Sequence, residues 1–87
     1  MSFEIRTTPK FERLFKKLPR DVQERVVKRI LNLAEEPYQG KPLHGKLKGK
    51  FSLVVGDYRV IYEVRENTVY LLAVGHRKKI YEKLEKS

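Results

Sequence analysis

Residues 56–81 read GDYRVIYEVRENTVYLLAVGHRKKIY, and this stretch decides the fold. It contains two apolar runs rich in Val, Ile, Leu and Tyr, which are residues that favour β-strands. Gly56-Asp57 precedes the first run and Glu66-Asn67 separates the two, and both pairs are predicted as turns. A third apolar run ends just before Gly56. The sequence therefore predicts three consecutive antiparallel strands, over residues 51–55, 58–65 and 68–75.

Upstream of these strands, the spacing of apolar residues predicts a short strand over residues 2–7 and then two helices. Thr8 can cap the first helix, and Pro9 suits its first position, where a missing N–H costs nothing. Pro19 interrupts the pattern. The second helix is predicted to begin at Pro19 or at Asp21, which has the spacing of a capping box with Glu24, and to end before the next proline.

A short final helix is predicted from about Lys79, since Ile80 and Leu84 lie four positions apart. The predicted fold class is α+β: one domain over residues 1–87, with an antiparallel sheet in β-α-α-β-β-β-α order, a two-helix hairpin on one face and a short C-terminal helix. With 0 Cys, no disulfide is expected to stabilise the core. The chain has neither a signal-peptide pattern nor a run of about 20 apolar residues, so we expect a cytoplasmic protein without membrane contact.

The formal net charge of +9 and the pI of about 9.9 are the strongest features of the composition. They predict attraction to polyanions such as nucleic acids; alternatively, they reflect the charged surface of a heat-adapted protein. Residues 37–50 hold four lysines and no acid, and three of these lysines alternate with other residues, so in an extended chain they line one side. They either bind phosphate or serve only solubility. The predicted phosphate-binding residues are Lys46, Lys48, Lys50, Lys78 and Lys79.

Arg59 lies inside an apolar strand, on the face that alternation also gives to Glu63. A buried, unpaired charge is costly, so two interpretations are open. Arg59 either pairs with Asp57 or Glu63, or its guanidinium offers a two-pronged donor to phosphate. His76 and Arg77 follow the neighbouring strand, so we expect them in the same region as Arg59. The surrounding cations favour a neutral imidazole able to accept a proton; alternatively, His76 is an ordinary surface histidine.

These residues suit a reaction that needs no cofactor. No carboxylate pair lies at ligand spacing near His44 or His76, and no GxxxxGK loop is present, so we expect neither a metal nor a nucleotide cofactor. RNA is cut when its own 2′-hydroxyl attacks the adjacent phosphorus. A protein then needs only to orient the strand, take one proton, give another, and neutralise the charge on the phosphate. Arg59 and Arg77 suit the neutralisation. His76 or Tyr81 suits the proton transfer, and Tyr81 could equally stack on a base.

Four segments together resemble the RelE/ParE superfamily of bacterial and archaeal type II toxins, over nearly the whole chain. They are Leu18-Pro19, Leu43-His44-Gly45-Lys46-Leu47, Tyr58-Arg59-Val60-Ile61-Tyr62, and Gly75-His76-Arg77 leading to Ile80-Tyr81. The resemblance implies a small sheet with helices packed on it and ribosome-dependent cleavage of mRNA. It also implies an acidic antitoxin that wraps the toxin, and binding to operator DNA only as the toxin–antitoxin complex. By the same resemblance, Arg59, Arg77 and Tyr81 match catalytic residues of RelE-type nucleases.

The chain departs from that pattern in one place. RelE-type enzymes often carry catalytic lysines on the first strand of the meander, at positions that look like Ser52 and Val54 here. Either one of the upstream lysines substitutes, or His76 takes the proton, or the activity is weak. The departure leaves open two alternatives to a nuclease: a ParE-like inhibitor of DNA gyrase, and a catalytically degenerate toxin that acts only as the antitoxin's partner or corepressor.

Overall fold

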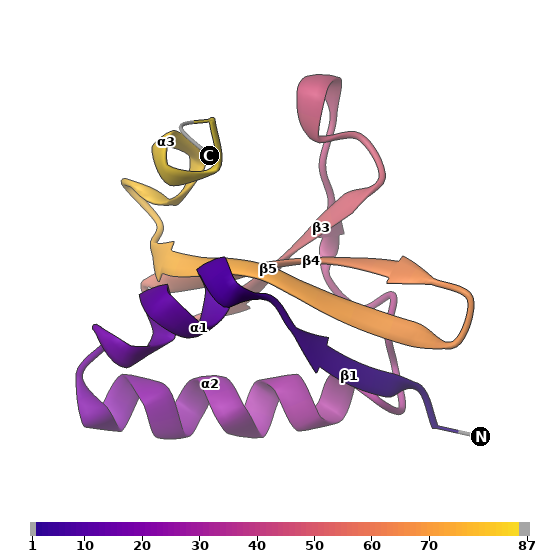
Figure 1. Cartoon of the computed structure of the whole chain (residues 1–87), viewed down its shortest axis with the longest axis horizontal. Coiled ribbons are helices and arrows are strands. Elements are labelled where there is room, and N and C mark those ends of the chain that lie inside the picture. Colours follow the sequence, from indigo (N-terminus) through magenta and orange to yellow (C-terminus); the bar gives the residue numbers. More distant parts are fainter. Residues whose placement is uncertain (1, 86–87) are drawn as a thin grey trace.

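The computed structural model describes residues 2–85, which form a five-stranded sheet with helices on both of its faces (Figure 1). The elements are β1 (Glu4–Thr7), α1 (Pro9–Lys16), α2 (Arg20–Leu33), β2 (Lys41–Pro42), the 3₁₀-helix η1 (Gly45–Leu47), β3 (Lys50–Val55), β4 (Tyr58–Arg65), β5 (Thr68–His76) and α3 (Ile80–Glu85). The predicted α+β class is confirmed, and so is the predicted order of elements apart from the additional short elements β2 and η1. Among the described residues, no helix is long and apolar enough to cross a membrane.

The sheet has the order β1-β5-β4-β3-β2, and β3, β4 and β5 form the predicted antiparallel meander, while β2 pairs with β3 in antiparallel. The exception is β1, which pairs with β5 in parallel, so the sheet is mixed. The chain passes through both helices between β1 and the meander, and local sequence does not fix the direction in which such a distant strand docks. The two-residue strand β2 lies inside the predicted loop.

The helix α1 begins as predicted. The Thr8 side chain accepts a hydrogen bond from the Phe11 N–H, and Pro9 occupies the first turn. The predicted capping box of α2 is wrong, because Pro19 is the N-cap residue and no side chain caps this end. Instead, Gln23 Nε2 donates to the carbonyl oxygens of Phe15 (3.0 Å) and Leu18 (3.2 Å), which ties the start of α2 to the end of α1.

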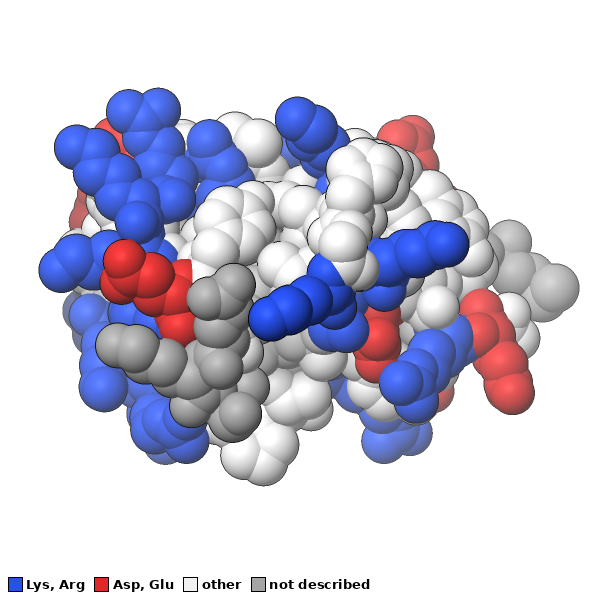
Figure 2. Space-filling view, turned by 90° about the horizontal axis from the view of Figure 1, so that it is seen from above, with Lys and Arg blue, Asp and Glu red and all other residues white. Residues whose placement is uncertain are grey.

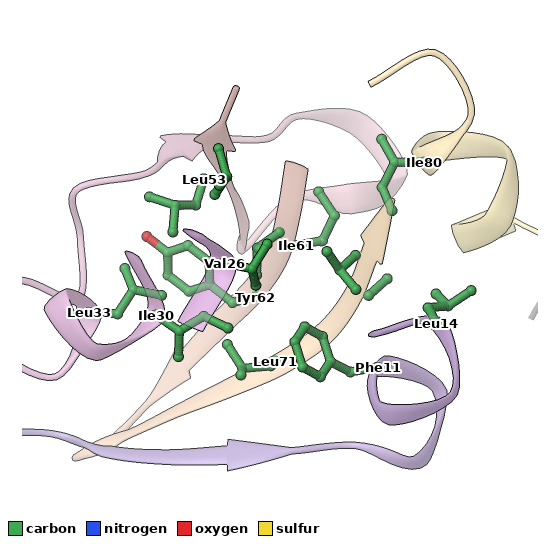
Figure 3. Close-up of a cluster of buried hydrophobic side chains, with 14 of the residues drawn as sticks. Phe11, Leu14, Val26, Ile30, Leu33, Leu53, Ile61, Tyr62, Leu71 and Ile80 are labelled. Carbon is green, nitrogen blue, oxygen red and sulfur yellow. The ribbon is translucent and has the colours of Figure 1, made fainter. Parts of the chain in front are cut away.

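The core lies between the sheet and the helices α1 and α2 (Figure 3). Tyr62 is its largest fully buried side chain, and the hydroxyl of Tyr62 accepts a hydrogen bond from the Gly40 N–H at 2.9 Å. On the opposite face, Ile80 of α3 is also fully buried. Apolar packing on both faces explains the nearly continuous apolar sequence of β4 and β5.

One irregularity in β5 decides which residues share a face. Ile61 pairs with Ala73 and Tyr62 pairs with Leu71, so Leu72 is an extra residue in β5 without a partner in β4. Such a bulge shifts the alternation of side chains by one residue. Beyond the bulge, Gly75 lies opposite Arg59 on the α3 face of the sheet.

Candidate nucleic-acid interface

Arg59 has no acidic partner. Arg59 Nη1 donates to the carbonyl oxygens of Gly56 (2.9 Å) and Tyr58 (2.8 Å), which holds the guanidinium beside the β3–β4 turn. The ion pairs of residues 2–85 are Glu4–Arg6 and Glu63–Arg65. The interpretation in which Arg59 pairs with Asp57 or Glu63 is therefore wrong.

Arg77 reaches the same turn through its backbone. The Arg77 N–H donates to the Asp57 carbonyl oxygen at 2.8 Å, one residue from the Gly56 oxygen that Arg59 binds. The Arg77 side chain is exposed. The Arg59 side chain and the Arg77 backbone are thus bound to the two residues of one turn, so both residues lie at the same end of the sheet.

His76 lies at the same end of the sheet as Arg59, as expected, but on the other face, so the two side chains do not share one pocket. His76 pairs with Tyr58, and the two rings make an edge contact with centroids 5.5 Å apart. Without the bulge at Leu72, alternation from Leu71 would have put His76 on the Arg59 face. The Lys78 N–H donates to His76 Nδ1 at 3.2 Å. Nδ1 acts as the acceptor in this contact, so in the neutral ring the proton lies on Nε2, which is then a donor.

Tyr81 lies on α3, and Ser52 and Val54, where RelE-type enzymes often carry lysines, lie on β3 beside β4. Tyr81 follows the buried Ile80 on α3 and is 40% exposed, so its phenol is accessible. Val54 pairs directly with Arg59 and is 49% exposed, whereas Ser52 is buried. The strand next to Arg59 therefore presents the apolar side chain of Val54 where RelE-type enzymes often carry a lysine.

The predicted phosphate-binding lysines do not form one row. Lys46 lies in η1, and Lys48 directly follows it, between Gly45 and Gly49, which both have positive φ. The expectation of an extended segment with lysines along one side is therefore wrong, because the glycines fold the chain back. Lys50 begins β3, while Lys78 and Lys79 are exposed in the turn before α3.

A groove of about 430 Å³ lies between α3 and η1, over the sheet. Its lining includes Lys10 and Lys50, together with Leu47, Leu72 and Leu84. Figure 2 looks onto this side of the molecule and shows Lys and Arg side chains on both sides of an uncharged strip. An uncharged floor with cations along its rims suits a strand whose phosphates run along the outside.

Lys10 and Lys83 also belong to this face, but the sequence did not predict them as binding residues. Lys10 Nζ donates to the Lys83 carbonyl oxygen and so ties α1 to α3. Desolvation, followed by repulsion from Arg13, lowers the pKa of Lys10. Lys83 lies three positions after Ile80 and hence on the same side of α3, a helical spacing that the sequence did contain. Among residues 2–85, no three His, Asp or Glu side chains are grouped as a metal site.

The fold and this basic face define a toxin of the RelE/ParE superfamily. The family model described as the ParE toxin of the type II toxin–antitoxin system, parDE, matches residues 5–81, and the chain belongs to this family. It is 37% identical to Toxin RelG of Mycobacterium tuberculosis over 87 residues, which cover 95% of this chain and 100% of the relative.

Solved structures agree with this assignment. In the RelBE2 toxin–antitoxin complex of M. tuberculosis, the matching chain has a TM-score of 0.83 and 36% identity, with 88% of this chain and 100% of that chain covered. The isolated Escherichia coli RelE toxin has a TM-score of 0.76 and 21% identity, with 98% and 97% of the two chains covered, and at that identity it supports the fold alone.

Proposed function

We propose that this toxin is a metal-independent endoribonuclease that cuts mRNA on the ribosome and thereby inhibits translation. The observation that carries the proposal is Arg59, a partly buried arginine that lacks a carboxylate partner and is anchored at the same turn as Arg77. A guanidinium held in place without a counter-charge is suited to a phosphate. The relatives whose names include RelG and RelBE2 add support for a RelE-type target.

In the proposed mechanism, the 2′-oxygen of the RNA attacks the adjacent phosphorus, and the 5′-oxygen of the next nucleotide leaves. Arg59 and Arg77 neutralise the charge that develops on the phosphate oxygens; one such donor contributes about 3 kcal/mol. One of the loop lysines Lys46, Lys48 and Lys50, in its neutral form, accepts the proton of the 2′-hydroxyl. Tyr81, with its accessible phenol, donates a proton to the leaving 5′-oxygen. Lys46, Lys48, Lys50, Lys78 and Lys79 position the RNA backbone.

We further propose that an acidic antitoxin neutralises the toxin. Complementary charge favours fast association with a protein of net charge +9. The M. tuberculosis relative was solved as a toxin–antitoxin complex, which supports such a partner. Operator DNA is expected to bind only the complex. In the cytoplasm, the free toxin would meet ribosomes and mRNA directly.

The test is induction of the intact toxin and of the Arg59→Ala and Arg77→Ala variants, with primer-extension mapping of transcripts. The intact toxin should arrest growth with cuts at ribosome positions, and each variant should cut about 100-fold more slowly. The matched control is Arg65→Ala, because Arg65 lies on the same strand as Arg59 but is exposed and paired with Glu63. Its activity should be unchanged.

The second candidate, a ParE-like gyrase inhibitor, is favoured by the absence of lysines at Ser52 and Val54. Arrested replication with intact transcripts would support this candidate and contradict the nuclease. A third outcome, tight antitoxin binding without any toxicity, would identify a degenerate toxin that serves only as a partner or corepressor.

A further inference from the structure

Lys83 lies over Gly75, beside Arg59. A Cβ atom added to Gly75 would lie 3.8 Å from Lys83 Nζ and 3.3 Å from Ile80 Cδ1. The absence of a side chain at this position therefore leaves the space that α3 occupies. Because Gly75 pairs with Arg59, the ammonium group lies above the strand position next to Arg59.

Arg59 and Lys83 form a pair of like charges on one face. Directly opposite residues of an antiparallel pair have Cβ atoms about 5 Å apart, so a side chain that covers Gly75 borders the Arg59 side chain. Neither cation is in an ion pair within residues 2–85. Two neighbouring cations without a counter-charge repel each other unless an anion lies between them, so this arrangement favours an anion at the gap.

The position of Lys83 is fixed from two sides. Ile80 of the same helix is fully buried against the sheet, and the side chain of Lys10 donates to the Lys83 carbonyl oxygen. On the other flank of Arg59, the paired residue is the exposed Val54. The cation beside Arg59 therefore comes from α3 and not from β3.

We propose that Lys83 is a third phosphate-binding residue of the site and contacts the same phosphate as Arg59. The inference rests on the proposed function for the nature of that anion, an RNA phosphodiester. Arg59 supplies a planar donor group of fixed direction, and Lys83 supplies a compact ammonium on a flexible stem. In the attack of the 2′-oxygen, Lys83 helps to neutralise the charge on the non-bridging oxygens, and Lys10 is a positioning residue that acts through α3.

The test uses full-length protein from cell-free synthesis and inorganic pyrophosphate as the probe. NMR signals of the Arg59 guanidinium and the Lys83 ammonium should shift together on titration. Lys83→Gln should weaken pyrophosphate binding about tenfold, because it removes a charged hydrogen-bond donor. Lys83→Arg keeps a positive charge and should restore most of the binding. The matched control is Lys28→Gln, which removes an exposed lysine of α2 and should leave binding unchanged. Equal affinities of Lys83→Gln and Lys28→Gln would overturn the proposal.

Cleavage of ribosome-bound mRNA by the same variants separates this inference from the proposed function. If pyrophosphate binding depends on Lys83 but the intact toxin cuts no mRNA, the site stands and the nuclease fails. If Lys83→Gln cuts mRNA as fast as the intact toxin, the nuclease stands and the role of Lys83 is wrong.

Discussion

The Tyr62 hydroxyl is the polar group at the centre of the core. It accepts a hydrogen bond from the Gly40 N–H and so satisfies a backbone donor in the loop that follows α2. Burial raises the pKa of Tyr62, and the hydrogen bond from Gly40 partly opposes this effect. The contact is tight, since a Cβ at Gly40 would lie 2.6 Å from the Tyr62 hydroxyl oxygen. One phenol thus joins the middle of the sheet to the loop that carries the basic residues.

The Tyr62→Phe substitution should lower the free energy of unfolding at pH 7 by about 1–3 kcal/mol, because it leaves the buried Gly40 N–H unpaired. The pH dependence should also change. The folded state holds the phenol proton more tightly than the unfolded state, so this contribution is complete below about pH 10 and is lost as the pH rises above that value.

Urea unfolding between neutral pH and pH 11 measures both effects. The unfolding free energy of the intact protein should fall more steeply above about pH 10 than that of Tyr62→Phe. The control Tyr38→Phe, at an exposed tyrosine, should follow the intact protein. Parallel curves for the intact protein and Tyr62→Phe would contradict the assignment.

At the scale of elements, Thr8 connects the start of α1 to the sheet. Its hydroxyl oxygen accepts the Phe11 N–H at 3.2 Å and donates to the Leu71 carbonyl oxygen at 2.8 Å. The β1 strand pairs only with Thr68–Leu71, so α1 takes over the edge of β5 from this point. Thr8 therefore lies between β1 and α1, caps the start of α1 and binds it to β5.

The Thr8→Ala substitution should destabilise the protein by about 1–2 kcal/mol, since it removes the cap and leaves the Leu71 carbonyl without this donor. Thr8→Ser, which keeps the hydroxyl oxygen, should lose much less. Thermal or urea unfolding of the three proteins measures the difference. Equal midpoints for Thr8→Ala and Thr8→Ser would mean that the hydroxyl does not stabilise α1.

At the scale of the whole molecule, the two faces of the sheet have different tasks. The helices α1 and α2 cover one face and bury the core, while α3 and η1 lie on the other face (Figure 1). The groove lies between α3 and η1. Lys and Arg side chains lie along this face (Figure 2). The buried core therefore lies on one side of the sheet and the proposed RNA-binding groove on the other.

If the face that carries Arg59, Arg77 and the groove binds single-stranded RNA, affinity should fall steeply with salt. The slope of log K against log salt concentration should be about −0.7 for each phosphate contacted. Arg77→Ala should reduce the magnitude of this slope by about 0.7, because one phosphate contact is lost. Fluorescence anisotropy with a labelled oligoribonucleotide measures the slopes. The control Arg6→Ala, at an exposed residue paired with Glu4, should leave the slope unchanged, and an equal change in both variants would argue against a defined site.

Much of the fold was encoded in neighbouring residues. The turns at Gly56-Asp57 and Glu66-Asn67, the strands between them and the Thr8 cap depend on local backbone preferences and hydrogen bonds, so short sequence patterns predict them. The location of Arg59 within an apolar strand likewise marked it as a candidate from sequence alone.

Three features depend on contacts between distant segments, and only the tertiary structure decided them. They are the parallel pairing of β1 with β5, the bulge at Leu72 that turns His76 away from Arg59, and the placement of Lys83 over Gly75. In each case the residues involved allow more than one arrangement locally. Packing of the whole sheet selects one of them, because moving a strand by a single residue exchanges its buried and exposed faces.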